Sequence, residues 1–238
     1  MAADETSNPA ALHNFELVYP RPGARILTDV EPIGRSGHSM VCDDSNIYVL
    51  GGYNPLGRAL NSQGRPTVLE EFWKFNLATK KWMKMETAGF PQTCASSCML
   101  FRGNHVYIFG GTSYPFGQIV SNQIKMCNIA NPQRGLSGAG CSGHVYKWDS
   151  LTEEPPSASA SSTSIMIDEH KPPKGYGQSM VFHGDYVYTF GGAVGFYTEA
   201  INDLHRLNVN TLAWEHLEPQ GEIPEGRYKQ EIIVDNDR

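Results

Sequence analysis

The chain has 238 residues and a formal net charge of −6, with 40% hydrophobic and 18% charged residues. This balance is typical of a globular protein and not of a disordered one, and the acidic charge disfavours a nucleic-acid partner, whose phosphates attract basic surfaces. Residues 1–11 are polar and contain no apolar segment, so we expect no signal peptide. The sequence contains no apolar run of about eighteen residues, so we expect no membrane-spanning helix. Its five cysteines include no Cys-x-x-Cys spacing, which favours a reducing compartment, cytoplasmic or nuclear.

We expect residues 1–33, which precede the first repeated unit, to form an N-terminal tail with short strands at 15–19 and 25–28. Pro20, Pro22 and Gly23 end the first of these candidates, because proline lacks the N–H group that a strand ladder needs. We expect residues 1–12 to be flexible, since terminal segments are poorly ordered unless a sheet or helix holds them.

Three hairpins of the same design follow along the chain. Each joins two apolar strands through a short polar turn, at 39–50, 97–109 and 179–190. Every second strand ends in two glycines, and the pairs are Gly51 and Gly52, Gly110 and Gly111, and Gly191 and Gly192. Paired glycines indicate a sharp turn close to a neighbouring segment, where a Cβ would obstruct the backbone.

A tryptophan follows each hairpin at a spacing that confirms the repeat. Trp82 lies six residues after Asn76, and Trp214 lies six residues after Asn208. The same spacing from Asn128 reaches Arg134, whereas the next tryptophan, Trp148, lies fourteen residues further on. We therefore expect an insertion of this length in the middle unit. Tryptophan suits the outer strand because its large ring fills the gap between adjacent sheets.

The order of these signals resembles the kelch repeat, whose second strand ends in Gly-Gly and whose fourth strand carries Trp. The resemblance divides the chain into a tail at 1–33, blade one at 34–90, blade two at 91–174, blade three at 175–221 and the start of blade four at 222–238. It implies an all-β, kelch-type β-propeller that is incomplete, with about three four-stranded antiparallel blades plus the first strand of a fourth. Because propellers close with about 4–8 blades, we expect the sequence to be a fragment of a longer protein.

Three insertions lengthen the repeats. One is a Gly/Pro/Asn-rich loop at 53–68, the second is Gly/Ser-rich at 131–143, and the third is Ser/Pro-rich at 152–174. The second and third have little apolar surface to bury, so we expect mobile loops. Two readings of the Ser-rich segment stay open, a tolerated insertion and a regulatory phosphorylation segment.

Several short sequence stretches narrow the resemblance to one group of six-bladed kelch proteins. The matching stretches include 35–39, 50–55, 176–180 and 224–228. Proteins of this group carry a helical segment after the propeller that docks on elongin and cullin-2. The resemblance implies a substrate receptor of a cullin-2 ubiquitin ligase, which reads peptides with a C-terminal glycine, and a role in stress-kinase signalling. We expect elongin and cullin-2 to contact only a C-terminal segment absent from this sequence. A structural or scaffolding kelch protein, such as an actin-associated one, is the alternative.

The candidate binding residues lie at two kinds of position. Aromatic and polar residues that follow the Gly-Gly pairs should gather at one end of the ring; they are Tyr53, Asn54, Tyr114, Phe116, Phe196 and Tyr197. Arg35 and Arg227 occupy equivalent places at the start of an innermost strand, with Gln92 and Lys174 as the nearest counterparts in blades two and three. Such arginines either bridge neighbouring blades or bind a peptide carboxylate. The ligand set implied for a peptide C-terminus is Arg35, Ser39, Tyr53, Phe196, Arg227 and Tyr228.

Motifs of enzymes and metal sites do not emerge from the sequence. The eight histidines show no metal-ligand spacing, and no nucleophile or phosphate-loop motif occurs. Cys94 and Cys98 are expected as small buried residues and not as a zinc pair, and residues 43–46 as a hairpin turn and not as a calcium loop. The sequence therefore predicts a non-catalytic protein without cofactor or metal.

Overall fold

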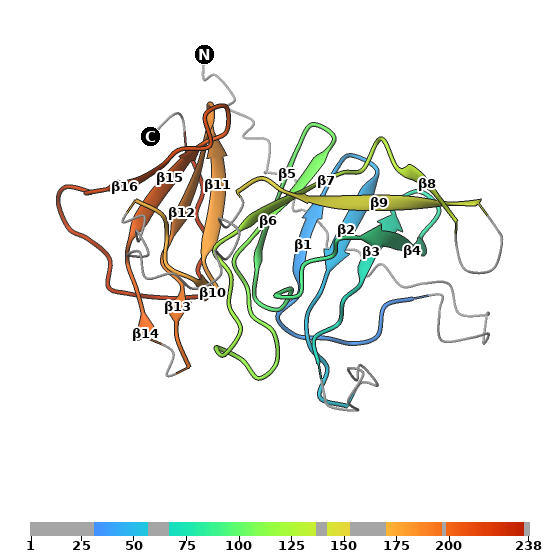
Figure 1. Ribbon diagram of the computed structural model, residues 1–238, viewed down its shortest axis with the longest axis horizontal. Helices are drawn as coiled ribbons and strands as arrows, with labels where there is room; N and C mark the ends of the chain where they lie inside the picture. Colours follow the sequence, from blue (N-terminus) through green and yellow to red (C-terminus); the bar gives the residue numbers. More distant parts are fainter. Residues whose placement is uncertain (1–30, 57–66, 137–141, 153–169, 197–198, 236–238) are drawn as a thin grey trace, which may run out of the picture.

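The computed structural model describes residues 31–56, 67–136, 142–152, 170–196 and 199–235. In these residues the chain forms sixteen strands and no helix (Figure 1), and accordingly no described helix is long and apolar enough to span a membrane. The all-β prediction is confirmed. Most of the N-terminal tail, the expected strands at 15–19 and 25–28, the core of the Ser/Pro-rich insertion and Tyr197 lie outside the described residues.

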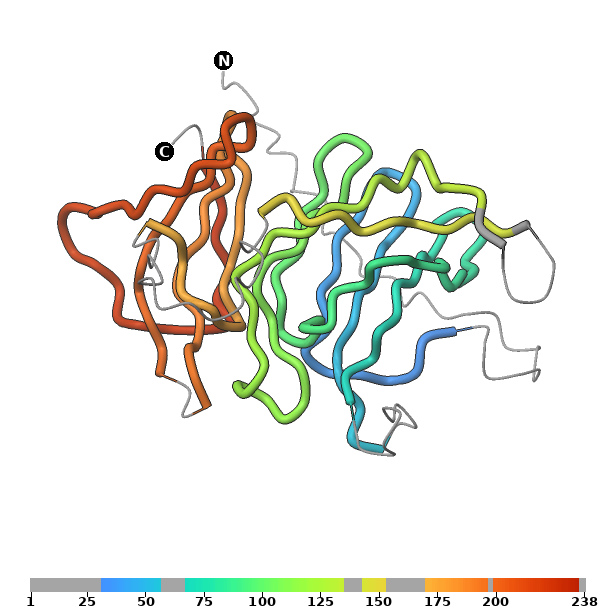
Figure 2. The backbone as a smooth tube through the Cα atoms, viewed as in Figure 1, coloured from blue at the N-terminus to red at the C-terminus, as the bar shows by residue number. Residues whose placement is uncertain are grey.

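Three four-stranded antiparallel blades follow one another along the chain, from blue to red in Figure 2. Blade one contains β1 (Ser39–Cys42), β2 (Asn46–Leu50), β3 (Phe72–Asn76) and β4 (Lys81–Ala88). Blade two contains β5 (Cys98–Arg102), β6 (His105–Phe109), β7 (Ile124–Asn128) and β9 (Ser142–Ser150). Blade three contains β11 (Ser179–His183), β12 (Tyr186–Phe190), β15 (Leu204–Asn208) and β16 (Trp214–Leu217). The Gly-Gly hairpin is the inner pair of each blade, as the sequence predicts.

The tryptophans occupy the same register on the outermost strand of every blade. Each faces the residue that directly precedes the marker asparagine of the third strand, in the pairs Phe75 and Trp82, Cys127 and Trp148, and Leu207 and Trp214. This register confirms the alignment of Trp148 with the other two and the insertion that it requires.

The marker asparagines hold the turn between the third and fourth strands. The side-chain oxygen of Asn76 accepts the backbone N–H of Thr79 at 2.9 Å, and that of Asn208 accepts the N–H of Asn210 at 2.9 Å. Asn128 accepts the N–H of Ala130 at 3.0 Å in the same way. A short amide side chain that caps its own turn explains why asparagine recurs at this position.

The insertion at 131–143 differs from the expected loop. It contains β8 (Gln133–Leu136), which forms an antiparallel hairpin with the first half of β9. The same half of β9 pairs in parallel with the end of β4, so blades one and two share one hydrogen-bonded sheet (Figure 1). Ladder hydrogen bonds use backbone groups, so a Gly/Ser-rich segment with few apolar side chains still forms strands where a partner edge is present.

The paired glycines bring consecutive blades into backbone contact. A Cβ on Gly51 (φ +66°) would collide with the carbonyl oxygen of Cys94, at the start of blade two. The N–H of the second glycine donates to the next unit in all three cases, from Gly52 to Cys94 at 3.0 Å, from Gly111 to Gly175 at 3.0 Å and from Gly192 to Arg227 at 2.9 Å. The close approach predicted from the glycines is therefore an inter-blade contact.

A chain of backbone hydrogen bonds links the innermost segments of all four units. Ser96 donates to Gly37, Gly177 donates to Ser96, and Lys229 donates to Gly177, each at 2.7 Å. All four residues have a positive φ, between 51° and 67°. Residues 222–235 thus take the place of the fourth unit's start, although the structure assigns no strand there. In the complete blades the innermost strand pairs only with the second strand of its hairpin. Residues 222–235 have no such pairing in the described part of the chain, so the expected first strand of a fourth blade is not formed there.

Two apolar cores lie between the blades. The first joins Leu50 and Phe72 of blade one to Val106 and Trp148 of blade two, and the second joins Phe109 and Ile124 of blade two to Val187 and Leu207 of blade three. Trp148 meets Phe72 edge-on at 5.5 Å between ring centroids. A single blade cannot cover both of its faces, so these cores fix the blades relative to one another and bring their loops to one end.

A short third sheet shapes this end of blade three. It contains β10 (Gly175–Tyr176), β13 (Ala193–Val194) and β14 (Glu199–Ala200). Single bridges between Ser36 and Tyr53, and between Ala95 and Thr112, occupy the equivalent positions of blades one and two. In each blade the loop after the Gly-Gly pair is therefore tied to the start of the innermost strand.

Candidate functional site: an aromatic rim at the loop end

Aromatic side chains from two blades stack where the loops after β2 and β6 meet. The rings of Tyr53 and Tyr114 lie parallel, with centroids 5.1 Å apart and an interplanar angle of 4°. Phe116 packs its edge against both rings, at 5.1 Å from Tyr53 and 5.5 Å from Tyr114. The predicted clustering is confirmed for these three residues. Desolvation and the neighbouring Tyr114 hydroxyl raise the pKa of Tyr53 above its ordinary value.

Blade three continues this cluster. A Cβ on Gly117 would lie 2.6 Å from the carbonyl oxygen of Gly195 and 3.0 Å from the Cα of Phe196, so the loops of blades two and three touch. Phe196 is 57% exposed. Figure 1 shows these loops together at the lower edge of the view, below β6 and around β13 and β14. We call Tyr53, Tyr114, Phe116 and Phe196 the aromatic rim.

Thr112 fixes the loop that carries two of the rim residues. It is almost fully buried, and its hydroxyl oxygen accepts the backbone N–H of Gly117 at 3.0 Å. The hydroxyl also lies 3.0 Å from the carbonyl oxygen of Ile119, to which it can donate. The loop is thus held at both ends, and Tyr114 and Phe116 project from a fixed backbone.

Further large apolar side chains are exposed around the rim. They lie in the same loops or at the starts of innermost strands, and they are Ile33, Leu56, Ile119 and Tyr228. Exposed apolar patches on a folded domain mark interaction sites. Sequence reasoning missed Leu56 and Ile119, whose signal is a large aliphatic residue inside a Gly/Pro-rich loop.

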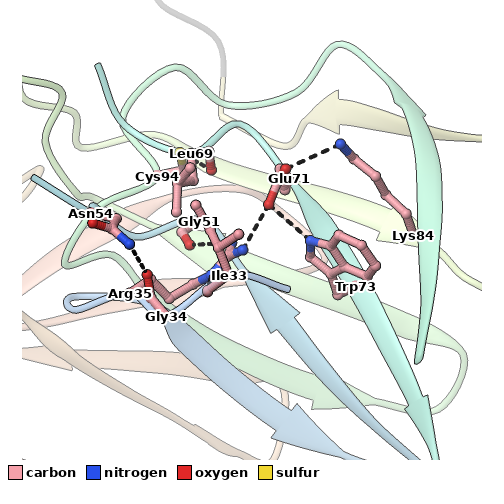
Figure 3. A network of polar contacts seen from close by, with 10 residues as sticks. All are labelled: Ile33, Gly34, Arg35, Gly51, Asn54, Leu69, Glu71, Trp73, Lys84 and Cys94. Atoms are coloured by element: carbon pink, nitrogen blue, oxygen red, sulfur yellow. Dashed lines mark hydrogen bonds and ion pairs between the residues drawn. The ribbon is translucent and has the colours of Figure 1, made fainter. Parts of the chain in front are cut away.

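Arg35 is tied into a network within its own blade (Figure 3). Its side chain is only 4% exposed, and it forms a 2.7 Å ion pair with Glu71. Its Nε donates to the carbonyl oxygen of Ile33 at 3.0 Å and its Nη1 to that of Gly51 at 3.1 Å. Arg35 therefore holds the Gly-Gly turn of blade one from the inside, and each of its three guanidinium nitrogens donates a hydrogen bond within the chain.

Glu71 is the centre of this network. It also accepts hydrogen bonds from the indole N–H of Trp73 at 2.9 Å and from Lys84 at 3.1 Å. Desolvation by itself would raise the pKa of Glu71, but the hydrogen bonds from Trp73, Arg35 and Lys84 outweigh it, and the pKa lies below its ordinary value. The carboxylate stays charged and keeps Arg35 in place.

Arg227 repeats the position of Arg35 in a different environment. Both donate through Nε to the carbonyl oxygen two residues earlier, at 3.0 Å. The inter-blade hydrogen bonds place Cys94 and Gly175 at the equivalent positions of blades two and three. These are not the Gln92 and Lys174 suggested by the sequence. Arg227 is exposed, so its guanidinium is accessible to a ligand.

The remaining two candidate residues have structural neighbours. Ser39 is buried between blades one and two, and its hydroxyl lies 2.5 Å from the carbonyl oxygen of Ser97. Tyr228 is 42% exposed and meets Tyr176 edge-on at 6.4 Å. The structure thus brings Tyr53 and Phe196 into one rim, leaves Arg227 and Tyr228 exposed nearby, and uses Arg35 and Ser39 inside the fold.

Groups for catalysis or metal binding are sparse in the described part of the chain. No group of three or more His, Cys, Asp or Glu side chains is placed there to hold a metal ion. Burial raises the pKa of the Cys94 and Cys98 thiols to about 12. A thiol with such a pKa is a poor nucleophile.

The fold and the loop-end site together define a kelch-type propeller protein, and comparison with known proteins agrees. The KLHDC2/KLHL20/DRC7 Kelch-repeats domain matches residues 24–238. The chain therefore belongs to the kelch-repeat family, whose domains are generally non-enzymatic protein-interaction domains.

Its relatives include Kelch domain-containing protein 10. The Rattus norvegicus protein is 32% identical over 216 residues, which are 87% of this chain and 45% of that protein. The Homo sapiens protein is 33% identical over 216 residues, covering 87% and 41% of the two chains. The chain thus spans less than half the length of these relatives. The solved structure of YjhT is 17% identical and matches with a TM-score of 0.53, over 82% of this chain and 54% of that one, which shows the fold alone.

Proposed function

We propose that this kelch protein is a non-catalytic adaptor that binds a protein or peptide partner through the aromatic rim. The observation that carries the proposal is the stacked cluster of Tyr53, Tyr114 and Phe116, joined by the exposed Phe196, on loops from three blades. Aromatic side chains that are rigidly held and partly exposed supply most of the binding energy in many interfaces. A cytoplasmic or nuclear location belongs to the proposal, and the four described cysteines are free thiols, as in a reducing compartment.

A random-peptide display selection on the immobilised chain tests the rim. We expect enriched peptides to bind the parent protein and to lose at least tenfold in affinity when Tyr114 and Phe116 are both changed to alanine. The matched control changes Leu77 and Leu212 to alanine, since these exposed apolar residues follow β3 and β15 at the opposite end. Equal loss in both double variants would contradict the proposal.

The finer form of the proposal concerns the whole protein. By resemblance, it is a substrate receptor of a cullin-2 ubiquitin ligase that recognises a C-terminal glycine, with a role in stress-kinase signalling. A free carboxylate needs charge-assisted donors, and the fork of an arginine matches its geometry. The side chain of Arg35 is 4% exposed and each of its guanidinium nitrogens donates within the chain, so we assign this role to the exposed Arg227. Tyr228, beside it in the sequence, is the nearest candidate wall.

Calorimetry with a peptide that ends in glycine and with its C-terminal amide tests this assignment in the full-length protein. We expect the free acid to bind more tightly, and the Arg227→Gln substitution to cost about 2–5 kcal/mol of its binding free energy. Arg206→Gln is the control, because Arg206 pairs with Glu215 on the outer half of blade three. Equal affinity for acid and amide would eliminate carboxylate recognition and favour the scaffolding alternative.

A further inference from the structure

Blade one holds an arginine of its own, and this arrangement is a template for the other blades (Figure 3). The guanidinium of Arg35 donates to the carbonyl oxygens of Ile33 and Gly51 and to the carboxylate of Glu71. The shortest of these contacts is the 2.7 Å ion pair with Glu71. The same place can be located in the other blades, because the backbone hydrogen bond that positions Glu71 recurs.

The acidic half of this arrangement is repeated in blade three. The N–H of Gly51 donates to the carbonyl oxygen of Glu71 at 2.9 Å, and the N–H of Gly191 donates to that of Asp203 at 3.1 Å. Glu71 directly precedes β3, and Asp203 directly precedes β15, which are the third strands of their blades. Asp203 is therefore the equivalent of Glu71 and carries a carboxylate beside the Gly-Gly turn of blade three.

The basic half of the arrangement is not repeated. Gly175 takes the place of Arg35 in blade three, as the inter-blade hydrogen bonds show. A Cβ on Gly175 would lie 2.6 Å from the carbonyl oxygen of Ala193, which leaves no room for a side chain at this position. Blade three thus keeps the acid without the arginine, whereas blade two has neither, with Cys94 and Gln123 at the two positions.

Asp203 lacks the donors that surround Glu71. It is half-buried, and among the described residues no hydrogen bond or ion pair to its carboxylate forms. In blade one the indole N–H of Trp73 and the ammonium of Lys84 complete the set of donors to Glu71. Partial burial of a carboxylate without a partner is unfavourable, so a cation supplied from outside the chain would stabilise this site.

Two imidazoles take the places of Trp73 and Lys84 in blade three. His205 and His216 face each other across the ladder of β15 and β16, with ring centroids 4.7 Å apart. Burial and the imidazole of His216 lower the pKa of His205 to about 4, against the effect of the Asp203 charge. His205 is therefore neutral at pH 7 and provides no positive charge for Asp203.

The segment that carries Asp203 is fixed at the loop end, close to the aromatic rim along the chain. It follows β14, which pairs with β13, and β13 leads into Phe196 of the rim (Figure 1). Ile201 donates its N–H to the carbonyl oxygen of Gly192, and Arg227 donates its N–H to that of Ile201, each at 3.0 Å. A partner that lies on the rim therefore has a defined acidic group near it.

We propose that Asp203 binds an arginine side chain of the partner, as Glu71 holds Arg35 within blade one. A planar guanidinium can form two parallel hydrogen bonds with a carboxylate, which an ammonium cannot. The carbonyl oxygen of Gly191, equivalent to that of Gly51, is the second acceptor of the site. The proposal rests on the proposed function, because the partner on the rim supplies the arginine, and the net charge of −6 favours a cationic segment.

A small guanidinium compound tests the site without involving the rim. Backbone amide shifts are followed by NMR while the 238-residue chain is titrated with N-acetyl-arginine methylamide at pH 7.5 and constant ionic strength. We expect saturable shifts at the amides of Gly191, Asp203 and Leu204. The lysine analogue should bind at least threefold more weakly, and the neutral glutamine analogue should give no saturation.

Substitutions of single residues decide whether Asp203 holds the cation. Asp203→Asn should weaken the binding at least tenfold, and Asp203→Glu should retain it to within about threefold, because the carboxylate is kept. The matched control is Asp185→Asn, which removes an exposed carboxylate from the hairpin turn at the opposite end of blade three. Arg35→Ala should open a second saturable site, seen at the amides of Gly51 and Glu71.

Shifts that never saturate, or that saturate equally in Asp203→Asn, would overturn the arginine site. Equal binding of the arginine and lysine analogues would overturn the preference for a guanidinium, and this comparison holds even if Asp203→Asn does not fold. Each of these results leaves the rim proposal standing, because the Tyr114 and Phe116 variants test the rim with peptides.

Discussion

Replacement of Trp148 by alanine is the perturbation that probes how the blades hold together. The side chain is 3% exposed, and its ring meets Phe72 of blade one at 5.5 Å and Phe90 at 6.2 Å, edge-on in both cases. A tryptophan buries about 150–250 Å², which at about 25 cal/mol per Å² corresponds to about 4–6 kcal/mol as an upper limit. Measured losses for buried aromatic residues are about 3–5 kcal/mol, so we expect about 4 kcal/mol.

Trp82→Ala is the matched control for this prediction. Trp82 occupies the same register in blade one, but it is only partly buried and its ring contacts Phe75 of its own blade, at 4.9 Å. We expect it to cost about half as much free energy of unfolding as Trp148→Ala. Urea unfolding, followed by circular dichroism, measures both. A loss for Trp148→Ala no larger than for Trp82→Ala would refute the inter-blade role of this tryptophan.

Three further predictions follow from local geometry. Gly51→Ala should cost more than about 3 kcal/mol of unfolding free energy, because its Cβ would collide with the carbonyl oxygen of Cys94 in blade two. The control Gly103→Ala has open space around the new Cβ and a φ of +60°, so it should cost about 1 kcal/mol in the same urea assay. Burial and the facing imidazole of His216 on β16 lower the pKa of His205 to about 4. Below pH 6.5 the unfolded chain takes up a proton at this residue before the folded protein does, so about 3 kcal/mol of the unfolding free energy is lost as the pH falls toward 4. His205→Gln should remove this part of the pH dependence, and a difference in unfolding free energy between the parent and the variant that stays constant from pH 6.5 to 4 would count against it. Iodoacetamide should label the exposed Cys42 and spare the buried Cys94 in the native protein, as peptide mass spectrometry would show; rapid labelling of both would be inconsistent with the core.

The repeat could be predicted from the sequence because its signals are local backbone requirements. Paired glycines mark positions with positive φ and no room for a Cβ, and asparagine marks a turn that its own side chain caps. Neither requirement depends on distant residues. The register of Trp148 followed from the same spacing even though an insertion separates it from Asn128.

The site could be predicted only in part, since its chemistry depends on pairings between distant residues. Arg35 and Arg227 look alike in the sequence, but Glu71, 36 residues away from Arg35, engages the first, and the second is exposed. The sequence also assigned Lys174 to an arginine-like position, whereas hydrogen bonding places Gly175 there and the lysine beside a cavity. Side-chain stacking across the rim depends on the angle between blades, which no local pattern encodes.

The most direct test of the aromatic rim as the partner-binding surface compares three versions of the full-length protein. The quantity compared is the amount of each protein that binds to each version. The parent, the Tyr114→Ala and Phe116→Ala double variant, and the Leu77→Ala and Leu212→Ala double variant are expressed at equal levels, and the proteins that copurify are measured by mass spectrometry. We expect a defined set of partners to be lost from the rim variant and retained by the opposite-end variant. Full retention of those partners by the rim variant would contradict it.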